Sequence, residues 1–165
     1  MGGAFLLLET KNVVQFALFF GTTWFVNSLV FAGVLLSVLA AIETTNRIRL
    51  PRPVFLYVAL GASLALAWFI PQESLLALSP VPRFFAATAV AFTPIYLANL
   101  IFTQRFRDAE ATAIAFAANL LGAMLGGAAE YMALITGYHF LLIVIAALYA
   151  AAFLSGTRRR ARSVA

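Results

Sequence analysis

The feature that most constrains the fold of this chain is a series of long, nearly uninterrupted apolar runs. A transmembrane helix needs about 20 mainly apolar residues to cross a hydrocarbon core about 30 Å thick. The runs are continuous rather than alternating in polarity, which favours helices over a membrane barrel. Six stretches qualify, and they cover residues 3–20, 22–42, 53–70, 83–103, 109–135 and 138–154. The sequence therefore predicts an all-α integral membrane protein, with six transmembrane helices in residues 1–156 and a basic tail over 157–165.

The composition excludes a water-soluble alternative. Of the 165 residues, 64% are hydrophobic and only 10% are charged, whereas a soluble domain is about half apolar and about a quarter charged. Too few polar side chains remain to cover a globule in water, so a soluble enzyme and a disordered chain are both excluded. The chain has no cysteine, which rules out disulfides, thiolate zinc sites and a cysteine nucleophile.

The first apolar run is the weakest of the six, because residues 9–12 (ETKN) interrupt it. Its apolar start resembles a secretory signal peptide, but the positive charge lies inside the segment and no clean cleavage site follows. We expect this run to cross the membrane. A five-helix protein, in which the first run does not span, is the alternative.

Basic residues predict the orientation, since lysine and arginine concentrate in cytoplasmic loops. Nine of the 11 lie in the second connection, the fourth connection and the tail, which an even number of helices places on one side: Arg47, Arg49, Arg52, Arg105, Arg107, Arg158, Arg159, Arg160 and Arg162. The opposite side holds only Arg83. We predict that both termini are cytoplasmic and that the membrane is a bacterial inner membrane. The net charge of +5 then reflects topology and contacts with lipid headgroups rather than nucleic-acid binding.

Small residues predict where helices pack, because close backbone approach drives association inside a membrane. Ala115, Ala118, Gly122 and Gly126 form one stripe on the fifth span. We expect this span to be the most buried helix, with another backbone against the stripe, inside one chain or at a dimer seam. Pro94 predicts a kink in the fourth span that frees a carbonyl near residue 90.

Polar side chains within the spans indicate a buried cluster, because such groups usually face the protein interior and often mark function. At 100° per residue, the polar residues of the first span form one stripe, while Thr10 points away. Together with asparagines of the fourth and fifth spans they form a predicted inner cluster: Glu9, Lys11, Asn12, Gln15, Asn99 and Asn119. The cluster is either a structural network or a path for a solute or proton. A Lys11–Glu130 ion pair is not expected, since the rise along each helix separates them by roughly 20 Å in depth.

A second, shallower group of polar and aromatic residues is predicted near the outer surface. It consists of Trp24, Asn27, Glu130, Tyr131 and His139. Water reaches this depth, so a structural or interfacial role is favoured. Glu130 and His139 supply only two potential ligands, whereas zinc takes three or four, so no metal site is expected. No cofactor is predicted, although bound lipids are.

Four polar-bearing segments resemble the membrane region of bacterial spermidine-synthase-like polytopic proteins. They are residues 5–11 (FLLLETK), 20–28 (FGTTWFVNS), 119–131 (NLLGAMLGGAAEY) and 136–138 (TGY), so the similarity extends over nearly the whole chain. The resemblance implies a membrane body like half of a major-facilitator-type bundle, joined in that family to a soluble Rossmann catalytic domain. No glycine-rich loop after a strand is found here, so the family's catalytic activity does not carry over. The resemblance implies that the chain is a split gene product, or a fragment whose start is an internal methionine of a longer protein.

Three functions follow as hypotheses. The first is a non-catalytic membrane subunit that packs into or stabilises a larger complex. The second is a half-size transporter that acts as a dimer, since transporters place their sites near the midplane on broken helices. The third is a membrane module that works with a separate polyamine-synthase-like catalytic chain. In each case the expected partners are the bilayer and another membrane protein or a second copy.

Overall fold

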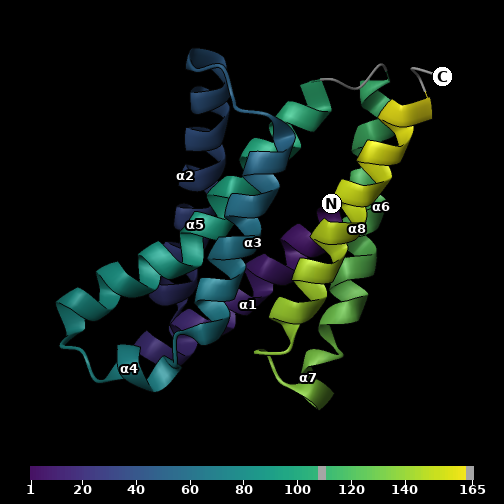
Figure 1. Cartoon of the computed structure of the whole chain (residues 1–165). Helices are drawn as coiled ribbons and strands as arrows, with labels where there is room; N and C mark the ends of the chain where they lie inside the picture. Colours follow the sequence, from purple (N-terminus) through teal and green to yellow (C-terminus); the bar gives the residue numbers. More distant parts are fainter. Residues whose placement is uncertain (108–110, 163–165) are drawn as a thin grey trace.

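The computed structural model describes residues 1–107 and 111–162, with only the backbone described for residues 134 and 157–162. Every regular element in these ranges is a helix (Figure 1). In chain order they are α1 (Gly2–Phe20), α2 (Trp24–Arg47), α3 (Pro53–Phe69), α4 (Gln72–Leu76), α5 (Pro80–Arg107), α6 (Thr112–Glu130), α7 (Ala133–Thr136) and α8 (Leu141–Arg162). The six long helices overlap the six apolar runs, although most of their bounds differ by several residues.

Four of the long helices, α1, α2, α5 and α6, are long and apolar enough to cross a membrane. The apolar parts of α3 and α8 are shorter, over residues 53–69 and 141–156. The outer surface is also strongly apolar. Its exposed side chains include Leu35, Leu36, Val58, Phe69, Phe85, Leu121, Leu125 and Ile135. An apolar exterior around a helical bundle is expected of a protein whose solvent is lipid, so the chain is an all-helical membrane protein with four candidate spans.

Local chemistry explains where several helices begin and end. Gly21 has a φ of +93°, a conformation that favours glycine, and it ends α1. The Thr23 hydroxyl then accepts a hydrogen bond from the Val26 amide at 3.2 Å and caps α2. Pro53 occupies the first turn of α3, where its missing amide hydrogen is not needed.

Two short helices, α4 and α7, are additional to the predicted elements. Residues 109 and 110 of the predicted span 109–135 lie outside the described residues, and the rest of the span is two helices, because the amides of Tyr131 and Met132 bond three residues back and close the last turn of α6. On the same side of the bundle, Arg83 donates from Nη2 to the carbonyls of Leu76 and Leu78, at 2.6 and 2.8 Å. The charge of Arg83 is therefore placed at the C-terminal carbonyls of α4.

The bundle is organised around α1 (Figure 1). Helices α2 and α3 both pack against α5, and α1 packs against α2 and α5 as well as α6 and α8. The connection between α2 and α3, the C-terminal end of α5 and the C-terminal end of α8 lie at one end of the bundle, while α4 and α7 lie at the other. The most deeply buried large side chains come from five helices: Leu7, Leu8, Phe16, Val30, Leu60, Ile95, Ile101, Leu141 and Ile145.

The expectation that the fifth span would be the most buried helix is wrong. Of the four candidate spans, α6 is the least buried, and Gly126 is its only residue classed as buried. The stripe allows one helix to approach closely, but close approach on one side does not place a helix at the centre. Helix α1 takes the central position, because it has neighbours on several sides.

Candidate functional site

The polar stripe of α1 lies inside the bundle. Lys11, Asn12 and Gln15 are all buried, and Asn12 is fully inaccessible to solvent. The ammonium of Lys11 donates to the Oε1 atom of Gln15, one turn further along the same helix. Glu9 is only partly buried, and within the described part of the chain the single ion pair joins Arg47 to Glu43. Lys11 is therefore held by a neutral acceptor rather than by a carboxylate.

Asn12 connects the stripe to the proline of α5. Its side-chain amide donates to the carbonyl of Ala91 at 2.9 Å, in the turn that precedes Pro94. A proline inside a helix removes one backbone hydrogen bond and disturbs the carbonyls of the preceding turn. Asn12 thus supplies a donor where α5 carries its proline, and α1 and α5 are fixed in register by this contact. The Oδ1 atom of Asn12 is buried without a hydrogen-bond partner among the described residues.

The glycines of α1 and α6 bring the two backbones into contact. A methyl group added at Gly126 would lie 2.6 Å from the Cα atom of Gly3, and one added at Gly3 would lie 2.7 Å from the carbonyl oxygen of Gly122. Gly2 lies against the backbone of Asn119. The contacting residue numbers rise together, so the two helices run in the same direction.

The contact between α1 and α6 also places the polar residues of the two helices at depths that differ from those expected from the sequence. Helix α1 starts level with Asn119, which is seven residues or about 10 Å into α6. As a result the Thr10 hydroxyl donates to the Oε2 atom of Glu130 at 3.1 Å. The separation of roughly 20 Å expected between this part of α1 and Glu130 is wrong, because that estimate started both helices at the same depth.

The asparagines of α5 and α6 do not join the α1 stripe. Asn99 donates to the carbonyl of Ile95 on its own helix, at 2.9 Å. Asn99 and Asn119 instead line a separate cavity of about 170 Å³, together with Phe5, Phe102 and Tyr149. The predicted inner cluster is therefore two sites, one buried network on α1 and one small cavity among α1, α2, α5, α6 and α8.

The outer group of residues is not a cluster. Trp24 is 80% exposed and packs edge-on against Phe25. Asn27 and Tyr131 are exposed as well. Glu130 bonds to α1, as described above, while His139 lies 4.0 Å from the ring centre of Trp68. Within the described residues, no three histidine, cysteine or acidic side chains are placed to hold a metal ion.

The basic residues gather at one end of the bundle. Arg47 pairs with Glu43 on α2, and the Gln104 amide donates to the Pro51 carbonyl at 3.4 Å, which joins the end of α5 to the α2–α3 connection. Arg49 and Arg52 lie in that connection and are exposed. Arg105 and Arg107 belong to the last turn of α5 rather than to a loop. The side chains of Arg158, Arg159 and Arg160 lie outside the described part.

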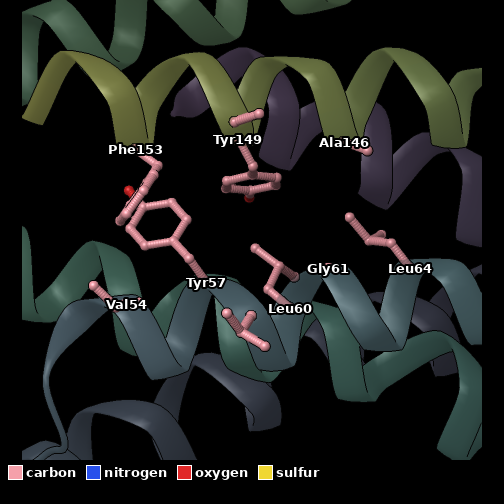
Figure 2. Close-up of a pocket in the computed structure, with 10 residues that line it drawn as sticks. Val54, Tyr57, Leu60, Gly61, Leu64, Ala146, Tyr149 and Phe153 are labelled. Atoms are coloured by element: carbon pink, nitrogen blue, oxygen red, sulfur yellow. The ribbon is translucent and has the colours of Figure 1, made fainter. Parts of the chain in front are cut away.

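One site was missed by sequence reasoning. A groove between α3 and α8 is lined by Tyr57, Leu60, Gly61 and Leu64 of α3 and by Tyr149 of α8, among others (Figure 2). Its volume is about 270 Å³. The sequence does place small residues here, at Gly61, Ala146 and Ala150. Small residues, however, predict that two helices approach closely, and not that a groove separates them.

Comparison with known proteins gives no family: no protein-family model, curated protein or solved structure matches this chain.

Proposed function

We propose that this chain is a non-catalytic subunit of a larger membrane complex, which it joins through the half of α6 that α1 leaves uncovered. One observation carries the proposal. Ala115 and Ala118 continue the line of Gly122 and Gly126, but α1 begins level with Asn119, beyond both alanines. Ala118 is exposed and Ala115 is partly exposed.

The occupant of this uncovered stripe is a transmembrane helix of another polytopic protein. Inside a bilayer there is no hydrophobic drive between apolar helices, so association depends on how closely two backbones can approach. Ala115 and Ala118 permit that approach, and the exposed Ile114, Phe116 and Leu121 beside them provide apolar contact area. Helix α5 also contacts α6, but Ala118 stays exposed.

The proposal includes the topology. All six long helices span the membrane. The bilayer thins locally around the shorter apolar segments of α3 and α8, and flanking arginines reach the headgroups. The end that carries Arg47 and Arg105 faces the cytoplasm, following the distribution of basic residues. Both termini are then cytoplasmic, the membrane is a bacterial inner membrane, and the bundle corresponds to half of a major-facilitator-like body.

Site-specific photo-crosslinking tests the subunit proposal. A photoreactive residue at Ala118 is expected to give a crosslink to a transmembrane segment of a second protein in native membranes. The same residue at Ala62, which is exposed on α3, serves as the matched control and is expected to capture only lipid. A reaction with lipid alone at both positions would contradict the proposal.

A half-size transporter that acts as a dimer is the second candidate, and the cavity with Asn99 and Asn119 favours it. A cavity of about 170 Å³ with two amide side chains offers polar contacts to a small solute. The identity of the crosslinked protein distinguishes the candidate functions. A different membrane protein supports the subunit, a second copy of this chain supports the transporter, and a chain with a Rossmann catalytic domain supports the polyamine-synthase-like module.

A further inference from the structure

The groove between α3 and α8 is held open by aromatic contacts at its two ends. At one end Tyr57 packs on Phe153, with ring centres 5.0 Å apart. At the other, Trp68 of α3 packs on His139, just before α8 begins, at 4.0 Å. Between these contacts Gly61, Ala146 and Ala150 are small, and a methyl group added at Gly61 would meet nothing within 4 Å. Figure 2 shows the open stretch to one side of the Tyr57–Phe153 pair.

The groove has the dimensions of one lipid chain. Its first section, from Val54 to Leu64, has a volume of about 270 Å³ and a length of about 15 Å for ten residues, which equals half of a hydrocarbon core about 30 Å thick. A second section of about 440 Å³ shares Gly61, Leu64 and Ala146 and continues to Phe69. A helix about 10 Å across is too wide for the first section, whereas an alkyl chain fits.

The groove ends at an arginine on the basic side of the bundle. The guanidinium carbon of Arg105 lies 5.9 Å from the ring centre of Tyr57, and its nitrogens lie against Gly156 of α8. Arg105 and the Tyr57 hydroxyl interact electrostatically. The Nε atom of Arg105 is buried and has no hydrogen-bond partner among the described residues, whereas the Tyr57 hydroxyl interacts with the guanidinium. A guanidinium without a carboxylate partner among the described residues thus lies at the end of an apolar groove.

We propose that the α3–α8 groove binds one anionic phospholipid of the cytoplasmic leaflet. One acyl chain lies along Gly61 and Leu64, and the phosphate pairs with the guanidinium of Arg105, which Tyr57 contacts. Arginine suits this role because its planar guanidinium matches phosphate geometry and its charge is permanent. The apolar lining explains the chain and the arginine explains the headgroup, and neither depends on the partner proposed for α6, whereas the choice of the cytoplasmic leaflet rests on the proposed topology.

Lipid competition tests the proposal. The full-length protein is reconstituted into nanodiscs with equal amounts of phosphatidylglycerol and phosphatidylcholine, extracted in mild detergent, and analysed by native mass spectrometry. One phosphatidylglycerol is expected to stay bound. Arg105→Gln should lower its retention relative to phosphatidylcholine by about tenfold, the scale of a lost charged hydrogen bond. Gly61→Leu fills the groove and should abolish retention of both lipids.

Matched variants make the test specific. Arg107→Gln removes an exposed arginine from the same turn of α5, and Ala62→Leu adds the same bulk at an exposed position of α3. Both should retain the lipid. If Gly61→Leu fails to give folded protein by size-exclusion chromatography, Ala150→Leu fills the groove from the α8 side. Unchanged retention in Arg105→Gln, or an equal loss in Arg107→Gln, would overturn the proposal, as would a bound apolar molecule without phosphorus.

Discussion

The hydroxyl of Thr10 and the carboxylate of Glu130 are joined by a hydrogen bond of 3.1 Å, although 120 residues separate them in the chain. The bond lies at the far end of the α1–α6 contact from the glycines, so it sets how far one helix slides along the other. A hydrogen bond within a membrane contributes about 0.5–1.5 kcal/mol. A contact of this size fixes register without dominating the stability of the bundle.

Replacing Thr10 tests this contact. Thr10→Val should lower the free energy of unfolding in detergent by about 0.5–1.5 kcal/mol, whereas Glu130→Gln should be tolerated because its amide oxygen still accepts the bond. Thr136→Val is the control, since the Thr136 hydroxyl bonds only to Met132 within its own turn. Equal losses from Thr10→Val and Thr136→Val would contradict a specific role for the α1–α6 bond.

Adding a methyl group to Gly126 should separate α1 from α6. The new Cβ atom would lie 2.6 Å from the Cα atom of Gly3 and 2.7 Å from its carbonyl, and neither backbone atom can rotate away. We expect Gly126→Ala to cost about 1–3 kcal/mol in thermal unfolding experiments. Gly61→Ala meets nothing within 4 Å, so this control should be neutral or slightly stabilising through helix propensity. Equal changes in stability for Gly126→Ala and Gly61→Ala would contradict the close contact between α1 and α6.

The bond from Asn12 to the Ala91 carbonyl should be coupled to Pro94. Asn12→Leu leaves that carbonyl without its side-chain donor, and we expect a loss of about 1–2 kcal/mol. Pro94→Ala supplies a backbone donor for the carbonyl of residue 90, in the same turn as Ala91, so this turn depends less on Asn12 and the same replacement should cost less. A double-mutant cycle in detergent measures the difference, and strictly additive losses would show that Asn12 and Pro94 act independently.

Replacement of Lys11 by methionine and replacement of Gln15 by methionine should have different effects on the stability of the protein. Lys11→Met removes a buried cation that has no carboxylate partner among the described residues, so the unfolding temperature should stay the same or rise. Gln15→Met leaves the ammonium without its acceptor and should cost about 1–3 kcal/mol. A large loss from Lys11→Met would show that the lysine meets an anionic group supplied by a ligand or partner.

The absence of cysteine from the chain permits a direct test of orientation. Arg49→Cys and Ser79→Cys introduce single thiols at exposed positions on the two ends of the bundle. In intact cells an impermeant maleimide should label Cys at position 79 and leave position 49 unlabelled until the membrane is opened. Labelling of both thiols from outside, or of position 49 alone, would reject the proposed topology.

Much of the local structure could be predicted from the sequence, because it depends on short-range physics. Continuous apolar runs require helices in lipid, and glycine, proline and capping threonine set several of their ends. The helical period also identified Lys11, Asn12 and Gln15 as one stripe. These inferences need only the spacing of residues along one element.

The relative position of the helices could not be predicted in this way, since it depends on contacts between distant segments. The depth of Glu130 beside Thr10, the exposure of α6 and the separation of Asn99 and Asn119 from Lys11 all follow from where α1 begins against α6. The groove at Gly61 depends on aromatic spacers that meet across α3 and α8. The sequence alone determined where the six long helices lie and which face of α1 is polar. Only the tertiary structure decided which faces meet, because shape complementarity between side chains of different helices is not encoded in the period of any one of them.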